Sequence, residues 1–269
     1  MTSPERTFTA AVDLLEEHFA LWSRDPGYLG LACPPYTNEC PPLLFIGGGA
    51  IPPGAVPLVV VSFEPLLTWH FPQQVEYAGR SVEQYVRWNM DYARVFPQIA
   101  GERPQSYWAA MGDFVHGWAA VAPDRAAPWP VLGSTMLELP FVPMHAQSHV
   151  PAGSMGAAAR LRELFIRRVE IVLQRWPRAA FVVLGARLHD RLRGDRLLDA
   201  ESQVDLPAER DLVRELGPRY LTAVYRSRLL VGSRPTVFLR RGPFSRFTNP
   251  RSAGRKYLGT LLRALHERP

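Results

Sequence analysis

Four short runs of apolar residues alternate along the chain with longer stretches in which apolar residues recur every three or four positions. The apolar runs cover residues 57–63, 135–142, 179–186 and 236–241. Continuous apolar runs of this length are typical of strands that are buried on both faces of a sheet. The periodic stretches predict helices, and they cover residues 5–24, 81–96, 106–122, 157–176, 208–217 and 253–267. Strands that alternate with helices predict one α/β domain in which helices cover both faces of a central parallel sheet.

A segment rich in proline and glycine separates the first predicted helix from the first predicted strand. We therefore expect residues 1–56 to form an N-terminal helix and a connector packed on the core, and residues 57–269 to form the main domain. The connector contains the sequence IGGGAIPPG, which lacks the Lys-Ser/Thr pair and the following helix of a phosphate-binding loop. We interpret this glycine cluster as an irregular surface loop.

The composition narrows the possible partners. At 269 residues and 47% apolar content, the chain can bury one sizeable core. The net charge is +6 and almost all of the positive charge is arginine, since Lys256 is the only lysine. Arginine is the better side chain for binding phosphate, so nucleic acid is the favoured partner. The sequence has no long uncharged apolar run and no basic and apolar leader, so we expect a cytoplasmic monomer without a membrane segment.

The sequence gives no strong indication of a metal or a cofactor. Cys33 and Cys40 are interpreted as free thiols, because two cysteines are too few for a structural zinc site. His145, His149 and His189 have no recognised ligand spacing. We therefore expect neither a metal nor a cofactor.

Polar side chains gather where the predicted strands end. Glu64 follows the first strand, Glu138 lies in the second, His145 and Gln147 follow it, and Arg187 ends the third. A basic segment, RRGPFSRFTNPRSAGRK, follows the fourth strand. The carboxyl ends of parallel strands meet at one edge of a sheet, where ligands bind in such folds. We therefore expect a pocket at this edge.

The motifs at this edge resemble those of the uracil-DNA glycosylase superfamily. SFEPL (62–66) falls where that family has a GQDPY-like motif, LELPFVP (137–143) where it has LNAVLTV, and RRGPFS (240–245) where it has HPSPLS. The resemblance covers residues 57–267. It implies a three-layer α/β/α fold with a central four-stranded parallel sheet, and removal of a base from DNA.

The resemblance also implies roles for individual residues. Glu64 takes the place of the carboxylate that activates water, Glu138 that of the asparagine that reads the base, and Arg240 that of the histidine that stabilises the departing base. Phe244 falls at the intercalating leucine and Ser245 at the closing serine. Glutamate and arginine replace the residues that select uracil, and a carboxylate accepts hydrogen bonds from an amino group. We therefore expect a base other than uracil, such as a hypermodified cytosine of the kind found in phage DNA.

The chemistry of base removal fits these residue types. The reaction passes through a cationic sugar while negative charge builds on the departing base. Glu64 can stabilise the cation and act as general base, and Arg240 or Arg241 can neutralise the base or hold a phosphate. Phe244 can fill the gap that a flipped base leaves in the DNA stack.

The predicted site is larger than these residues. The catalytic residues are Glu64 and Arg240. The residues predicted to bind the base are Phe63, Pro65, Trp69, Phe71, Glu138, His145 and Gln147. The residues predicted to bind DNA are Arg241, Phe244, Ser245, Arg246, Arg251, Arg255 and Lys256.

Two other functions stay open at this point. One is a DNA-binding protein of the same fold without catalysis, because two motif positions are replaced. The other is a hydrolase or transferase for a small anionic molecule, although the chain lacks a G-x-S-x-G elbow, a Walker A loop and a G-x-G-x-x-G loop. Single residues also have structural alternatives: Glu64 can cap a loop, Glu138 can pair with an arginine beneath the pocket, and Trp69, Phe71 and Phe244 can belong to the core.

Overall fold

The computed structural model describes residues 4–31, 37–63, 71–100, 106–120, 129–146, 158–199, 202–203, 224–239 and 252–267. The elements in chain order are α1 (Pro4–Arg24), β1 (Ile46–Gly47), β2 (Leu58–Ser62), α2 (Phe71–Gly79), α3 (Val82–Met90), α4 (Tyr92–Ala100), α5 (Ser106–Ala119), α6 (Trp129–Thr135), β3 (Met136–Pro140), α7 (Ala158–Arg175), β4 (Ala180–Leu184), α8 (Ala186–Gly194), β5 (Ser202–Gln203), β6 (Val224–Leu229), the short 3₁₀ helix η3 (Val231–Ser233), β7 (Arg234–Leu239) and α10 (Ser252–Glu267). No helix in these ranges is long and apolar enough to cross a membrane.

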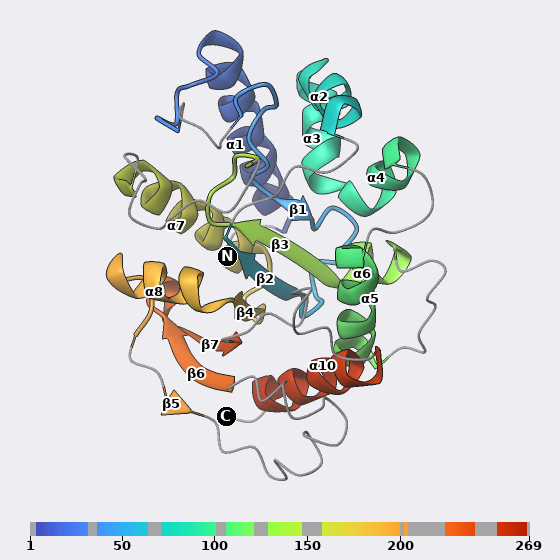
Figure 1. The fold of residues 1–269 in the computed structure, drawn as a ribbon, viewed down its shortest axis with the longest axis vertical. Coiled ribbons are helices and arrows are strands. Elements are labelled where there is room, and N and C mark those ends of the chain that lie inside the picture. Colours follow the sequence, from blue (N-terminus) through green and yellow to red (C-terminus); the bar gives the residue numbers. More distant parts are fainter. Residues whose placement is uncertain are drawn as a thin grey trace.

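A sheet with the strand order β1-β3-β2-β4-β7-β6-β5 lies at the centre of this mixed α/β fold (Figure 1). Strands β3, β2, β4 and β7 are parallel, and they are the four apolar runs of the sequence. The expectation of an all-parallel sheet is wrong, because β1, β6 and β5 extend it with antiparallel pairing. The sequence pattern did not predict these strands for two reasons. Strands β1 and β5 have only two residues each, and β6 carries Arg226 and Arg228, which interrupt its apolar pattern.

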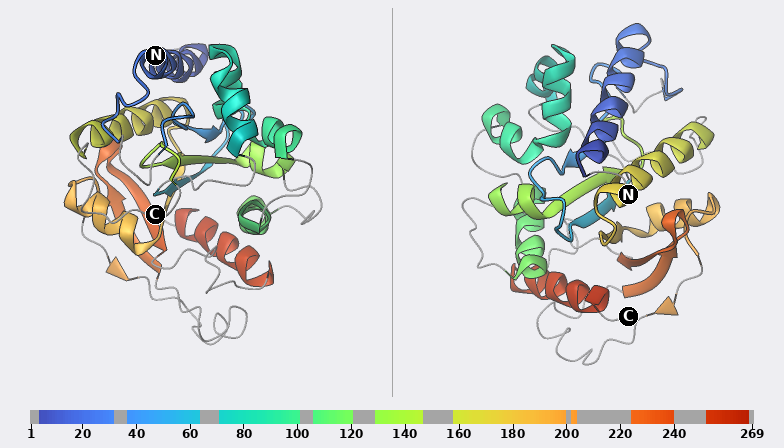
Figure 2. Two further views of the ribbon diagram at one scale, coloured as in Figure 1. Left: turned by 45° about the horizontal axis from the view of Figure 1, so that its top comes forward. Right: turned by 180° about the vertical axis from the view of Figure 1, so that it is seen from behind.

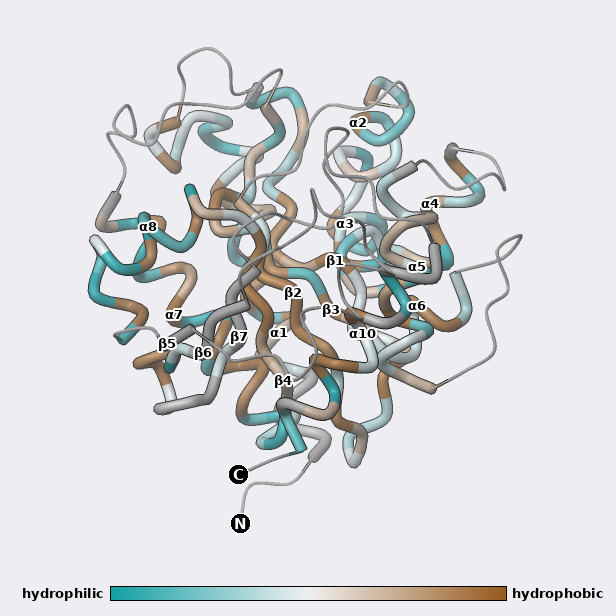
Figure 3. Tube along the Cα trace, turned by 60° about the horizontal axis from the view of Figure 1, so that its bottom comes forward, coloured by the Kyte–Doolittle hydropathy of each residue, from teal (hydrophilic) through white to brown (hydrophobic). Residues whose placement is uncertain are grey.

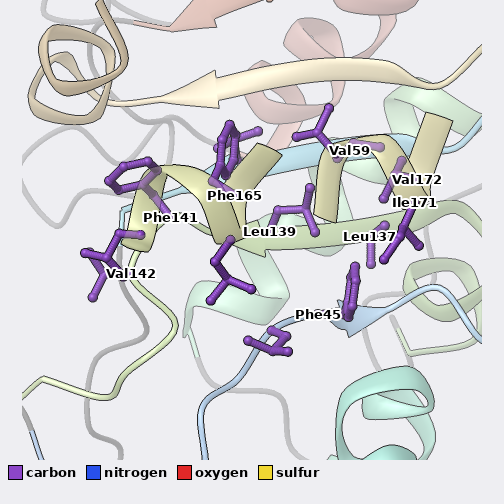
Figure 4. Close-up of a cluster of buried hydrophobic side chains, with 14 of the residues drawn as sticks. Phe45, Val59, Leu137, Leu139, Phe141, Val142, Phe165, Ile171 and Val172 are labelled. Carbon is purple, nitrogen blue, oxygen red and sulfur yellow. The ribbon is translucent and has the colours of Figure 1, made fainter. Parts of the chain in front are cut away.

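Helices pack on both faces of the sheet. In β2, Val59 and Val61 belong to a cluster with α1, α7 and α8, whereas Leu58 and Val60 belong to a second cluster with α2 to α6 and α10. Figure 2 shows α1 and α7 on one side of the sheet and α5 and α10 on the other. The strands form the apolar centre of the tube in Figure 3, and Figure 4 shows the first cluster.

The helix expected over 81–96 is two helices. Asp91 ends α3, and its backbone N–H donates to the carbonyl oxygen of Arg87. Helix α4 begins at the next residue and continues through Pro97. The helix expected over 208–217 lies outside the described residues.

Part of the connector between α1 and β2 is buried. The interpretation of its glycine cluster as a surface loop is therefore wrong for residues 46–48. Residues 40–48 are buried, and Ile46 and Gly47 pair with β3. Gly47 and Gly48 have φ angles of 93° and 99°, which side-chain-bearing residues rarely adopt. Within the glycine cluster, Ala50 and the turn from Pro52 to Gly54 are exposed. The prediction failed because burial of this segment depends on distant partners.

Polar side chains of α3 hold this connector. The Asn89 Oδ1 atom accepts a hydrogen bond of 3.0 Å from the backbone N–H of Phe45. The Tyr85 hydroxyl donates to the carbonyl oxygen of Pro42 at 2.6 Å. Both bonds are buried, so they satisfy backbone groups that have left water.

Arg168 of α7 connects three parts of the chain. Its side chain is fully buried, and its Nη1 atom donates to the carbonyl oxygens of Leu44 (3.0 Å) and Pro140 (2.7 Å). Its Nη2 atom donates to Phe141 (3.3 Å), and its Nε atom donates to Leu164 one turn earlier in α7 (3.2 Å). Burial lowers the pKa of Arg168 to about 9, so the side chain stays charged at neutral pH. The charge is solvated by carbonyl dipoles, and it joins α7 to the connector and to the end of β3.

Helices α5 and α10 cross with their backbones in close contact. A Cβ atom on Gly117 would lie 1.9 Å from the carbonyl oxygen of Lys256, and one on Gly259 would lie 2.0 Å from that of Phe114. Beside this crossing, the Asp113 Oδ2 atom accepts from Arg255 Nη2 at 2.7 Å and from Nε at 3.0 Å. The glycines set the approach of the two helices, and the ion pair sets their register.

We expect Gly117→Ala to lower the free energy of unfolding by about 1–3 kcal/mol or more, because the added methyl group meets backbone that cannot move without separating α5 from α10. Denaturant unfolding of both proteins would measure this. Gly194→Ala is the control, because no atom lies within 4 Å of the added Cβ. Equal losses in the two variants would contradict the close crossing.

We expect Arg168→Met to lower the free energy of unfolding by on the order of 3–5 kcal/mol, because several buried carbonyl oxygens lose a charged donor. Arg167→Met is the neighbouring control. Arg167 is half exposed and pairs with Glu17 at 2.8 Å, so its loss should cost less than about 1 kcal/mol. A small effect at both positions would show that Arg168 does not hold these segments together.

Candidate functional site

The carboxyl ends of β2 and β3 lie side by side. Ser62 is the register partner of Pro140. The backbone N–H groups of Phe141 and Val142 then donate to the carbonyl oxygens of Ser62 and Phe63, both at 2.8 Å. The chain segments that lead to Glu64 and to His145 therefore leave the sheet from neighbouring positions.

Glu138 lies on β3, on the face that α4 and α5 cover. Its side chain is only 5% exposed, and the Tyr107 hydroxyl of α5 donates to its Oε2 atom at 3.1 Å. Burial raises the pKa of Glu138 to about 7, while the Ser62 and Tyr107 hydroxyls act in the opposite direction. Although the Ser62 Oγ atom influences Glu138, it makes no hydrogen bond of standard geometry.

Within the part of the chain that the structure describes, Glu138 makes no ion pair. Arg168, the fully buried arginine, approaches the end of β3 from the face with α1 and α7, and the sheet separates it from Glu138. No described arginine pairs with Glu138 beneath the pocket, and Arg240 and Arg241 lie outside the described ranges. An uncompensated carboxyl group in this position favours its neutral form.

His145 and Phe71 form a second part of this edge. Phe71 begins α2, and its ring meets the ring of His145 edge-on, with 5.3 Å between the centroids. His145 is 3% exposed, and neither of its ring nitrogens has a hydrogen-bond partner among the described residues. Burial lowers the pKa of His145 to about 4, so the ring is neutral at pH 7. The two side chains predicted to bind the base therefore contact each other.

Phe63 is covered by a cation. The Arg187 guanidinium carbon lies 4.1 Å from the centroid of the Phe63 ring. Arg187 is the second residue of α8, which follows β4. Because β4 neighbours β2, this contact brings a positive charge to the same edge of the sheet.

The two described basic residues of the C-terminal segment, Arg255 and Lys256, differ in their surroundings. The side chain of Lys256 is exposed, and it lines a groove of about 500 Å³ with Thr260 and Arg263. Arg255 is mostly buried and pairs with Asp113. This ion pair gives Arg255 a role in holding α10, whereas its contact with DNA phosphate stays a prediction.

The remaining predicted site residues lie outside the described ranges. They are Glu64, Pro65, Trp69, Gln147, Arg240, Arg241, Phe244, Ser245, Arg246 and Arg251. Their roles stay predictions from the sequence and its resemblance.

The described ranges contain no cluster of three side chains suited to hold a metal ion. His145 and His189 are both described, whereas His149 is not. Cys40 is a free, buried thiol whose pKa is raised by burial, and Cys33 lies outside these ranges.

The sequence did not predict four of the contacts that the predicted site residues make. These contacts are made by Ser62, Tyr107, Asp113 and Arg187. Tyr107 lies in a helix rich in aromatic residues, so nothing in the local pattern distinguishes it from the core residue Trp108. Its contact with Glu138 joins residues 31 positions apart. No short-range signal could have found it.

Comparison with known proteins gave no matching family model, no matching curated protein and no matching solved structure.

Ionisation of Glu138 should lower the stability of the fold. The pKa is about 7 in the folded protein and 4.5 in the reference state, so the folded state holds the proton more tightly. Stability should therefore fall as pH rises from 4.5 through 7, by about 3 kcal/mol relative to Glu138→Gln, which does not titrate.

Denaturant unfolding of both proteins between pH 4.5 and 8.5 measures this difference. Glu83→Gln is the control, because the Glu83 side chain is 73% exposed, and its difference from the wild type should stay nearly constant. A constant difference for Glu138→Gln as well would show that Glu138 titrates normally.

Proposed function

We propose that the protein is a monofunctional DNA glycosylase that hydrolyses the N-glycosidic bond of a flipped base other than uracil and leaves an abasic site. In this proposal the fold is a three-layer α/β/α member of the uracil-DNA glycosylase superfamily. The observation that carries the proposal is the parallel pairing of β2 with β3, in which Val60 faces Glu138 and Ser62 faces Pro140. Two of the three motifs that resemble the family thereby belong to adjacent strands, as a shared base pocket requires.

The proposed mechanism divides the work between two carboxyl groups. Glu64, which follows Ser62 and Phe63, stabilises the cationic sugar and removes a proton from the attacking water. Glu138 contacts the base. Arg240 neutralises the charge that develops on the departing base.

The surroundings of Glu138 support its part in this division. Glu138 is buried against Tyr107 and has no cationic partner among the described residues, which suits recognition of an uncharged base. The neutral His145 and the ring of Phe71 line the neighbouring strand end. Flat rings and one carboxyl group are the components that hold a flipped base by stacking and hydrogen bonds.

DNA binding is supported by the charge of the chain. The net charge of +6 favours association with phosphate, and the exposed Lys256 lies in a groove on α10 that also holds the ion pair of Arg263 with Glu267. Binding should therefore weaken as salt rises.

The test is a base-release assay on DNAs that carry uracil, hypoxanthine, alkylated bases and modified cytosines of the phage type, with alkali used to cleave abasic sites. We expect the wild type to release at least one of the bases other than uracil. Glu64→Gln should slow release about 10²- to 10⁴-fold, because the water loses its general base.

Glu76→Gln is the matched control, since Glu76 is an exposed carboxylate of α2, and it should leave release unchanged. Salt-sensitive DNA binding without release of any base would favour the non-catalytic DNA-binding alternative. Absence of both would exclude the two DNA functions.

A further inference from the structure

The described groups that face Glu138, which are Ser62, Tyr92 and Tyr107, carry no charge at neutral pH. Tyr107 of α5 donates to the carboxyl group, Tyr92 of α4 lies close enough to interact electrostatically with it, and Ser62 of β2 is the nearest hydroxyl on the neighbouring strand. Burial raises the pKa of both tyrosines well above the usual value, and the nearby Glu138 contributes to this shift. Among the elements that the structure describes, none packed against Glu138 supplies a cation to stabilise a carboxylate.

The Tyr107 hydrogen bond distinguishes the two carboxyl oxygens. Because Tyr107 donates to Oε2, Oε2 is the better carbonyl oxygen and the proton of the neutral acid belongs on Oε1. A neutral carboxyl group then presents one donor and one acceptor side by side. Exchanging the two would leave Tyr107 donating to a hydroxyl oxygen, which accepts more weakly.

We infer that Glu138 reads the base as a neutral carboxylic acid, with Oε1–H donating to a ring nitrogen and Oε2 accepting from the adjacent amino group. This inference rests on the proposed glycosylase function and specifies its substrate class. The complementary edge is an unprotonated ring nitrogen beside an exocyclic amine, as in N3 and N4 of cytosine or N1 and N6 of adenine. The edge of uracil, with N–H beside a carbonyl, has the opposite order.

Ionisation of Glu138 removes the donor and places a negative charge against the lone pair of the ring nitrogen. Recognition should therefore be lost as pH rises, although the amino group could still donate to a carboxylate. Tyr107 acts here as a positioning residue, since it fixes which oxygen carries the proton and its hydrogen bond lowers the pKa of Glu138.

The experiment measures single-turnover base release between pH 6 and pH 9 from oligonucleotides that carry 5-hydroxymethylcytosine, adenine analogues or uracil. With a pKa of about 7 for Glu138, release of the amino-bearing base should fall about 100-fold over this range. Glu138→Gln should lose this dependence on pH, because an amide donates and accepts without titrating. Glu138→Leu should release little base at any pH.

Tyr107→Phe gives an independent readout. It removes a hydrogen bond that lowers the pKa of Glu138, so the fall in release should move to higher pH. A merely structural role for Tyr107 would change the rate without moving the midpoint.

Two results would overturn the inference while leaving the glycosylase function intact. One is the same pH dependence in wild type and Glu138→Gln, and the other is release that rises with pH as Glu138 ionises. Failure to release any base at any pH would instead overturn the proposed function and this inference together.

Discussion

The buried guanidinium of Arg168 is the interaction on which the arrangement of this protein depends. It joins α7 to the connector at Leu44 and to the carboxyl end of β3 at Pro140 and Phe141. A buried charge without a carboxylate partner is costly unless dipoles replace the lost water. These carbonyl oxygens replace it only when all three segments meet. The buried charge therefore favours the one arrangement in which the connector, the end of β3 and α7 lie together.

One ionisable side chain is buried on each face of the sheet, and the two have different surroundings. On one face, Arg168 remains charged because it donates to several carbonyl oxygens. On the other, burial raises the pKa of Glu138 to about 7, and the hydroxyl groups of Ser62 and Tyr107 offset this rise only in part. The two residues lie close along β3, since Arg168 binds the carbonyl oxygen of Pro140, but the sheet keeps them from forming an ion pair. The resulting carboxyl group is poised between its neutral and charged forms near physiological pH, which is typical of functional positions.

The close crossing of α5 and α10 ties the C-terminal helix to the site. Gly117 and Gly259 allow the helix backbones to touch, and the pair of Asp113 with Arg255 holds their register. Tyr107 lies at the start of the same α5 helix, so the position of α10 bears on the position of the hydroxyl that contacts Glu138. Helix α5 thus carries both the residues that hold α10 and the tyrosine that contacts Glu138.

The structure bears on the sequence resemblance at one point only, the placement of the first two motifs. The sequence motifs suggested a shared pocket, and the parallel pairing of β2 with β3 is compatible with it. The third motif, around Arg240, lies outside the described residues. Among the site residues that can be placed, Glu138, His145, Phe71 and Phe63 lie on the ends of adjacent elements, whereas Arg255 serves the helix crossing.

The sequence by itself determined the four buried parallel strands and most of the long helices, because apolar runs and helical periodicity are local signals that need no knowledge of distant partners. It also drew attention to Glu138 as a carboxylate in an apolar strand. Only the tertiary structure decided that residues 40–48 of the connector are buried, that Arg168 binds this segment, that Gly117 and Gly259 touch opposing backbones, and that Tyr107 donates to Glu138. Each of these depends on which distant segments meet. Free energies of burial and ionisation are set by those neighbours, not by residue type.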